Sequence, residues 1–330
     1  MAIEVAQVVA QFGAYYKPGS DNQKNLRSML YKPSETAKYF STRPTEDTIW
    51  RGNLSSLNRV VQPFQKAYTP IGTTTFVPNL FPLFKLKVDL LETPDDLEPS
   101  YLGFLTNVEE VERAKWPFVR WWMDQHVHTR MEEDFETAEY FKGVYAAPVA
   151  GIAGDAGTSM DGLRKVIRGY NTAGRTNLGN GAIAMGAPAA SDADFCTQIE
   201  EWFAQIPSQF RDKIDFIFMS KDNRYKYRRG KRAKYGKEFN FVTDQGVSGL
   251  VILEDFPQVS IVGLESHQGS DLIWCSVPLN RIRPQKKASL ANSMLVKEFS
   301  PRVVSAYTDF WEALNFEVPE FVFHNDQDLA

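Results

Sequence analysis

The segment from Asn107 to Lys142 carries the strongest helical signal in the chain, and it restricts the folds open to the sequence. Proline is tolerated in the first turn of a helix but not in an interior turn. We therefore predict a short helix, a kink at Pro117, and a long helix from Pro117 to Phe141 that Gly143 ends. At about 1.5 Å per residue, the long helix spans about 36 Å. Apolar residues follow it at helical spacing and predict one buried face: Phe118, Trp121, Trp122, Val127, Met131, Phe135 and Ala138.

Residues 1–65 are predicted to form an arm that lies over a surface and not a self-contained core. Apolar residues from Ile3 to Phe12 predict one short amphipathic helix. Three breaks follow in quick succession, at Lys17 to Ser20, Lys32 to Ser34 and Arg43 to Thr45. Short pieces of this kind bury too little to offset the entropy of ordering them, so the arm needs a partner surface.

A projecting β-hairpin is predicted next. Thr69 to Pro78 combines Thr and Val with a turn signal, and Phe84 to Leu90 alternates apolar and polar residues. Pro78 and Pro82 interrupt the segment between, and proline is confined to edges and irregular positions of sheets. The two strands are therefore expected to project from the body. We interpret Thr93 to Pro99 as a turn that follows them.

The remaining chain mixes helices and strands. A glycine-rich crossing precedes helices predicted around Asp161 to Gly169 and from Asp192 to Gln205, the second capped by Ser191 or Asp192. Glu317 to Phe323 is predicted to be extended. Four further strands are predicted: Ile214 to Met219, Val247 to Leu253, Val259 to Leu264 and Leu272 to Val277. No regular alternation of strand and helix is present, so the expected class is α+β. The 330 residues suffice for one large core or two coupled ones.

No pattern of catalytic chemistry stands out. Cys196 and Cys275 form no CxxC pair, and we interpret both as buried reduced thiols. His126 and His128 are two apart on a helix, so they point to different faces and do not easily share a metal. The first sixteen residues lack the basic region and cleavage site of a signal peptide, and no stretch of about 20 apolar residues is long enough to span a membrane. We expect no enzyme, no cofactor, no metal and no membrane contact.

The run from Lys221 to Lys237 is the one unusual charge feature. It holds nine basic residues against the single acid Asp222, although the whole chain carries a net charge of −4. Tyrosines interleave with the bases. Three interpretations stay open. The run docks onto an acidic neighbour such as another copy of the chain, which we favour, or it binds nucleic acid, or it is a solvated basic loop.

The order of these features resembles the Hong Kong 97-like major capsid fold of tailed bacteriophages, and in appearance the capsid proteins of phages that infect Bacteroidota. The resemblance covers most of the chain and depends on a colinear set of short segments. They are Gln62 to Gln65, Thr69 to Gly72 with Thr75-Phe76, Lys87 to Asp89 with Pro94 to Leu97, Gly103 to Leu105, Trp116 to Phe118, Phe141 to Gly143, and Phe310 to Phe316 with Pro319 to Phe321.

The resemblance implies a tile with an N-terminal arm, an extended β-hairpin loop, a peripheral domain with a spine helix and an axial domain. These correspond to residues 1–65, 66–105, 106–158 and 159–283, with 284–330 returning to the peripheral domain. Copies are then expected to assemble as hexamers and pentamers around packaged double-stranded DNA, in a virion capsid formed in the host cytoplasm. Subunit contacts are predicted at Phe76, Lys85, Lys87 and Asp89 of the hairpin, and at Arg228, Arg229 and Arg232 of the basic run.

Other partners follow from the same resemblance. A portal protein, decoration proteins and non-specific packaged DNA are expected. The arm is shorter than a cleaved scaffolding segment, which implies a separate scaffold protein or none. An encapsulin-like compartment that encloses a cargo enzyme is the alternative with the same fold. A nucleic-acid-binding protein or enzyme that uses the basic run is a third hypothesis.

Overall fold

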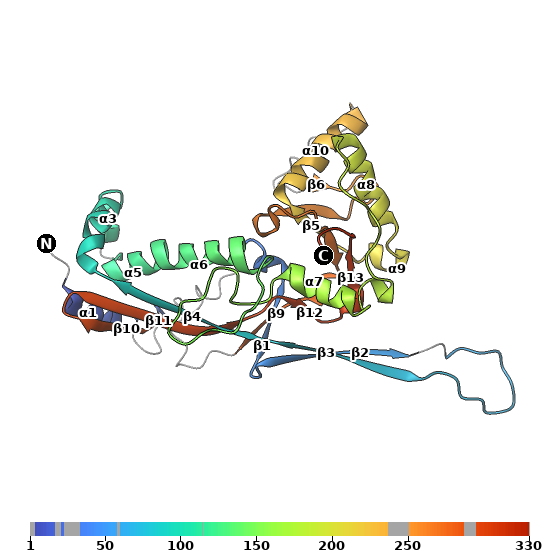
Figure 1. Cartoon of the computed structure of the whole chain (residues 1–330), viewed down its shortest axis with the longest axis horizontal. Coiled ribbons are helices and arrows are strands. Elements are labelled where there is room, and N and C mark those ends of the chain that lie inside the picture. Colours follow the sequence, from blue (N-terminus) through green and yellow to red (C-terminus); the bar gives the residue numbers. More distant parts are fainter. Residues whose placement is uncertain are drawn as a thin grey trace.

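A long helical segment lies beside a long antiparallel sheet, with a second domain standing above one end and a two-stranded ribbon extending beyond it (Figure 1). The computed structural model describes residues 4–16, 21–22, 34–57, 60–113, 115–236, 251–286 and 295–329. Within these ranges the backbone mixes helices and strands without a regular alternation. The α+β class predicted from the sequence is confirmed.

The predicted long helix is present and unbroken. It comprises α5 (Phe118–Trp122), the π-helical turn η2 (Met123–Val127), α6 (His128–Asp134) and a second π-helical turn η3 (Phe135–Glu139). Pro117 is its N-cap, with an extended ψ of 154°, and the short α4 (Glu110–Arg113) precedes it. The predicted kink is therefore confirmed. The π-turns had no signal in the sequence.

The long helical segment packs against a three-stranded antiparallel sheet in the order β10-β11-β4. These strands are Leu295–Ser300, Val303–Glu312 and Phe84–Glu92. Helix α1 (Val5–Tyr15) is the amphipathic helix predicted for the arm, and its buried Val5 and Val8 join the same apolar cluster as the tryptophans of α5. The arm helix α1 thus covers one end of the apolar layer between the long helix and the sheet β10-β11-β4.

The predicted pairing of the hairpin is wrong. Strand β3 (Thr74–Pro82) pairs with β2 (Ile49–Leu57), whereas β4 pairs with β11. Only Leu83 separates β3 from β4, and a hairpin needs a loop of at least about two residues. The chain therefore runs on from one sheet into the next at Leu83, whose N–H donates to the Thr48 carbonyl at 2.8 Å. The ribbon is β2–β3, and its first strand lies in the segment predicted to be an arm.

Two further sequence predictions fail at prolines. The predicted break at Arg43 to Thr45 lies inside β1 (Ser41–Thr45), which pairs in parallel with β9 (Arg281–Lys286). Strand β1 is the edge of the sheet β1-β9-β12, where the missing N–H of Pro44 costs nothing. The predicted turn at Thr93 to Pro99 is the start of helix α3 (Pro94–Thr106), because Pro94 fits the first turn of a helix. The breaks at 17–20 and 32–33 lie outside the described residues.

The second domain is built on the five-stranded sheet β13-β8-β5-β7-β6. Its strands are Val322–His324, Trp274–Ser276, Phe216–Ser220, Ser260–Leu264 and Val251–Ile252. They confirm the four strands predicted here, although residues 247–250 of one lie outside the described part. Strand β12 (Asn315–Phe316) and β9 connect this domain to the lower layer.

Helices cover this sheet. The predicted helices are present as α7 (Leu163–Thr172) and α8 (Asp192–Ala204), and the Ser191 hydroxyl accepts from the Asp194 N–H at 3.5 Å as the predicted cap. The short α9 (Ser208–Arg211) follows. The basic run is a regular helix, α10 (Lys221–Tyr235), and not a loop. Gly230 lies where α10 crosses α8 so closely that any Cβ would collide with the Asp192 carbonyl.

Candidate functional site

The groups that most often carry chemistry have structural roles here. Burial raises the pKa of the Cys196 thiol to about 12 and holds that of Cys275 well above its usual value. Burial lowers the pKa of His267 to about 3, and its ring lies between the Ser266 hydroxyl and the Trp274 indole N–H, each at 2.9 Å. These side chains fill the core between sheet and helix. Within the described ranges no three His, Cys, Asp or Glu side chains gather into a metal site.

The ribbon β2–β3 is the most conspicuous surface feature. It extends away from both domains (Figure 1). Its end exposes aromatic and aliphatic side chains almost fully, with Phe64 at 92% and Tyr68 at 93%. Others on the same end are Val60, Val61, Ile71 and Phe76. An isolated two-stranded ribbon is marginally stable at best, so this one needs another surface to pack against.

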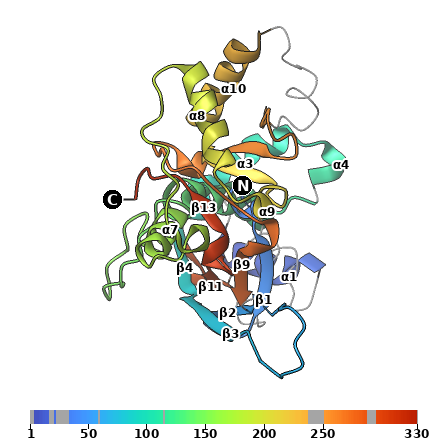
Figure 2. The same cartoon turned by 90° about the vertical axis from the view of Figure 1, so that its right-hand side faces the viewer.

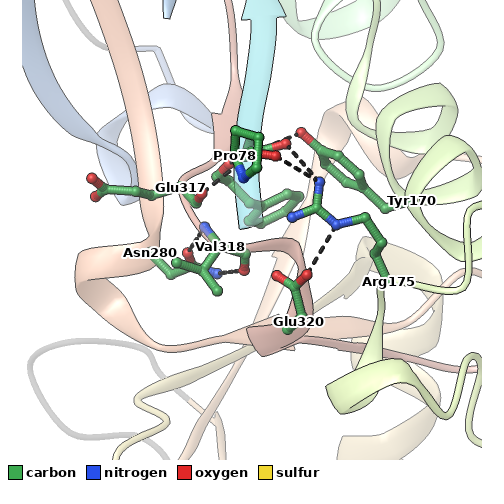
Figure 3. Close-up of polar contacts among 9 residues, drawn as sticks. Pro78, Tyr170, Arg175, Asn280, Glu317, Val318 and Glu320 are labelled. Carbon is green, nitrogen blue, oxygen red and sulfur yellow. Dashed lines mark hydrogen bonds and ion pairs between the residues drawn. The ribbon is translucent and has the colours of Figure 1, made fainter. Parts of the chain in front are cut away.

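The base of the ribbon is fixed by a polar cluster (Figure 3). The buried Asn79 side chain donates to the carbonyls of Phe316 and Glu317 at 2.8 and 3.2 Å. Arg175 pairs with Glu320 at 2.9 Å and also reaches the Pro78 carbonyl at 3.4 Å. The cluster links β3 to the segment between β12 and β13, so it sets the direction in which the ribbon leaves the body.

The structure separates the residues predicted to act together on the hairpin. Phe76 is exposed on β3 of the ribbon. Lys85, Lys87 and Asp89 lie on β4, in the sheet below the long helix. There Lys85 pairs with Asp309 of β11 at 2.9 Å, and Lys87 pairs with Asp89 at 2.6 Å. Only Phe76 of this set belongs to the projecting surface.

Four bases of α10, among them three lysines, have acidic partners within the chain. Lys221 lies between Glu35 and Glu265, at 3.2 and 2.9 Å. Lys234 pairs with the buried Glu200 at 2.6 Å. Burial by itself lowers the pKa of Lys234, but its hydrogen bond to Glu200 holds that pKa above the usual value for a lysine. Lys231 is itself buried and pairs with Glu254 at 2.9 Å. Much of the charge that is concentrated in the sequence therefore holds α10 on its own domain.

Three predicted contact residues remain together on the outer face of α10. Arg228, Arg229 and Arg232 line a shallow surface depression with Tyr225 and Asp222. Arg229 makes a two-point contact with Asp192, at 2.7 and 3.3 Å. Arg232 is exposed. The structure thus brings these arginines together on the upright domain, away from the ribbon (Figure 1).

Sequence reasoning missed the charged residues at the junction of the domains. The carboxylate of Glu136 accepts from the Ser34 hydroxyl at 2.5 Å and from the Thr36 N–H at 2.6 Å. Glu139 accepts from the N–H groups of Gly157 and Ser159 at 2.9 and 3.1 Å. The two glutamates lie one turn apart at the end of the long helix. No local pattern in the sequence distinguished these two acids from surface acids.

A buried ion pair lies at the same junction. Arg283 of β9 meets Glu312 of β11 through two contacts, at 2.5 and 2.8 Å, and the side chains are only 2% and 1% exposed. The Tyr140 hydroxyl at the end of the long helix lies 3.5 Å from the same guanidinium. The pair therefore joins the lower sheet, the junction sheet and the long helix at one point.

Solved structures similar to this chain include phage-like capsids and an encapsulin. A chain of the satellite phage P4 procapsid that includes the size determination protein Sid has a TM-score of 0.54 at 11% identity, covering 92% of this chain and 98% of that one. A chain from the capsid of an empty GTA particle has a TM-score of 0.51 at 12% identity, covering 90% and 97%. The holo-SrpI encapsulin complex from Synechococcus elongatus has a TM-score of 0.47 at 10% identity, covering 90% and 89%.

The fold is therefore the Hong Kong 97-like capsid fold, which confirms the fold expected from the sequence. No protein-family model and no curated protein matches the sequence. None of the helices in the described part of the chain is both long and apolar enough to cross a bilayer.

Proposed function

We propose that this chain is a major capsid protein, which self-assembles as hexamers and pentamers into the icosahedral shell of a tailed phage and encloses its double-stranded DNA. The ribbon β2–β3 carries the proposal. It exposes two aromatic side chains almost completely, at a distance from both cores. Burial of about 150–250 Å² per aromatic ring is a large stabilisation, and a second molecule packed on the ribbon would provide it.

The proposed role needs no catalytic group. The chain acts through surfaces that repeat in every copy, and each specific contact of this kind buries about 1,600 Å² in total. The division into arm, loop, peripheral domain and axial domain is part of the proposal, with the loop redefined as β2–β3, residues 49–82. Portal, scaffold and decoration proteins are proposed partners, and a Bacteroidota host stays a prediction.

The arginines of α10 are proposed to contact a neighbouring subunit. Arg228 and Arg232 lie on the outer face of the helix beside Tyr225. Pairing of the other bases with Glu200, Glu254 and Glu265 leaves a smaller positive surface than the sequence suggested. A small, partly neutralised patch suits a specific protein contact better than an extended track for DNA phosphates.

Shortening the ribbon tests the function. Leu57 and Thr74 face each other at the last pair of the ladder, so residues 58–73 can be replaced by an Asn-Gly turn that closes β2 onto β3. The wild-type protein should form closed shells visible by negative-stain electron microscopy, and the shortened chain should stay folded but form none. Normal shells from the shortened chain would refute the role of the ribbon.

The contents of the shells distinguish the two kinds of container. Particles purified from the native source should hold double-stranded DNA if the chain is a phage capsid protein. Particles that hold one defined protein and no DNA would identify an encapsulin-like compartment instead. A chain that stays monomeric and binds DNA with steep salt dependence would favour the nucleic-acid-binding hypothesis.

A further inference from the structure

A cationic groove runs along α7 at the base of the ribbon. It measures about 970 Å³ and lies between α7 and residues 78–81 of β3. Its cations are Arg164, Lys165, Arg168 and Arg175. Two acids, Asp161 and Asp328, line it as well. We call this site the α7 groove.

Two of these cations have no acidic partner among the described residues. Lys165 pairs with Asp161 at 2.6 Å, and Arg175 pairs with Glu320. Across the described part of the chain, no ion pair engages Arg164 or Arg168. These two side chains are one turn apart on the face of α7 that borders the groove. The groove therefore presents two uncompensated positive charges.

The α7 groove also has an apolar component. Leu80 of β3 and Val144 after the long helix both line it, and both are exposed. An apolar strip beside two free guanidinium groups is suited to a segment that carries an aliphatic side chain between carboxylates. A purely apolar segment would leave the two guanidinium groups without carboxylate partners, and a purely acidic one would leave the apolar strip uncovered.

Such a segment exists elsewhere on the same chain. Glu109 to Arg113, which includes α4, places Val111 between glutamates. Val111 is 84% exposed. Glu112 pairs with Lys115, whereas Glu109 and Glu110 are exposed without an ion pair in the described ranges. We call this segment the α4 knob.

The knob does not reach the groove of its own chain. Figure 2 shows α4 and α7 on opposite sides of the molecule. The complementary features therefore meet only between two copies. A contact that joins different patches on each partner is heterologous, so each copy both offers a knob and accepts one. Such contacts repeat around a ring.

We propose that the α4 knob of one subunit docks into the α7 groove of a second copy. Val111 packs against Leu80 and Val144 while Glu109 and Glu110 approach Arg164 and Arg168. The contact is additional to the ribbon, and it rests on the proposed self-assembly. It also accounts for an almost fully exposed valine on a short helix.

Charge reversal in both partners tests the contact. Arg164→Glu with Arg168→Glu should raise the protein concentration needed for half-maximal assembly by about tenfold or more, because like charges then face each other. Glu109→Arg with Glu110→Arg should do the same. The chain that carries all four changes should return to within about threefold of wild type, since the pairs are restored in opposite sense.

A matched control excludes a general effect of net charge. Asp95 and Asp96 are exposed acids on α3, at the same end of the molecule as the knob. Reversing them in the groove variant adds the same charge and should not restore assembly. The proposal would be overturned if Asp95→Arg with Asp96→Arg restored assembly of the groove variant. It would also be overturned if Glu109→Arg with Glu110→Arg failed to restore it. Unchanged circular dichroism confirms that each variant is folded.

Cross-linking gives a readout that does not depend on shell formation. Chains with Val111→Cys and chains with Leu80→Cys are mixed and treated with a mild oxidant, while the native thiols of Cys196 and Cys275 are buried and stay unreactive. The expected product is a covalent dimer of one chain of each kind. Shells without this dimer would contradict the contact but leave the proposed function standing. The dimer without closed shells would support the contact and count against the proposed function.

Discussion

Removing one partner of the buried ion pair at the domain junction should destabilise the subunit strongly. Glu312→Leu leaves the Arg283 guanidinium, 2% exposed, without its carboxylate. An uncompensated buried charge of this kind costs about 3–5 kcal/mol. With a slope of about 3 kcal/mol per molar urea, the unfolding midpoint should fall by about 1 M or more.

The assay is equilibrium urea unfolding followed by tryptophan fluorescence. The shortened-ribbon chain serves as the background, so that assembly does not contribute to the measured free energy. Asp309→Asn is the matched control, because Asp309 lies on the same strand and its partner Lys85 is on the neighbouring one. That pair is 51% and 55% exposed, so losing it should cost less than about 1 kcal/mol.

A double variant distinguishes the loss of the ion pair from the cost of leaving one charge buried without a partner. Arg283→Met with Glu312→Leu removes both charges and keeps the volume apolar, so most of the lost stability should return. A cost below about 1 kcal/mol for Glu312→Leu alone, equal to the surface control, would refute the reasoning. So would a double variant as unstable as the single one.

Three further outcomes are expected from buried positions. Gly230→Ala should lower the melting temperature of the subunit sharply, because a Cβ there meets backbone of α8, whereas Gly169→Ala in the open on α7 should raise it slightly. Burial lowers the pKa of His267 to about 3, so as the pH falls the unfolded chain binds a proton before the folded chain does. The free energy of unfolding should therefore decrease as the pH drops from about 6.5 towards 3. A His267→Gln chain should lose less of this free energy over the same pH window in urea titrations. Cys196 and Cys275 should react with a thiol reagent only after unfolding, and fast labelling of the native chain would contradict their burial.

Local patterns predicted the elements that depend on local physics. The long helix, α8 and the strands of the upright domain each show a period, a cap or an apolar run that the structure confirms. The kink at Pro117 was predicted correctly because proline lacks a backbone N–H. An interior helical turn is therefore disfavoured at Pro117 whatever the rest of the fold. The helix α3 was missed because Pro94 and Pro99 indicate a turn as well as a helix start.

Pairing between distant segments could not be predicted in the same way. The alternation in β4 indicates a strand but not its partner, so its nearest neighbour β3 was a natural and wrong choice. The partner β11 lies over 200 residues away in the sequence. The β2 strand was assigned to an arm because it follows three breaks in quick succession, and its register with β3 becomes visible only in three dimensions.

The charged residues show the same limit. The basic run was visible in the sequence, but its pairing with Glu200, Glu254 and Glu265 depends on the fold. Glu136, Glu139, Arg283 and Glu312 look like ordinary surface charges in the sequence. They are buried because β9, β11 and the end of the long helix meet at the domain junction, and no local sequence pattern predicts that meeting.

Direct imaging of the purified wild-type protein tests the central claim. A subunit with this fold and with exposed aromatic side chains at the end of its ribbon should appear as closed icosahedral shells by electron microscopy, with hexameric and pentameric units in the averaged particles. Sedimentation should show the same material as large particles that coexist with free subunits. A protein that remains monomeric at every concentration up to its solubility limit would contradict the account.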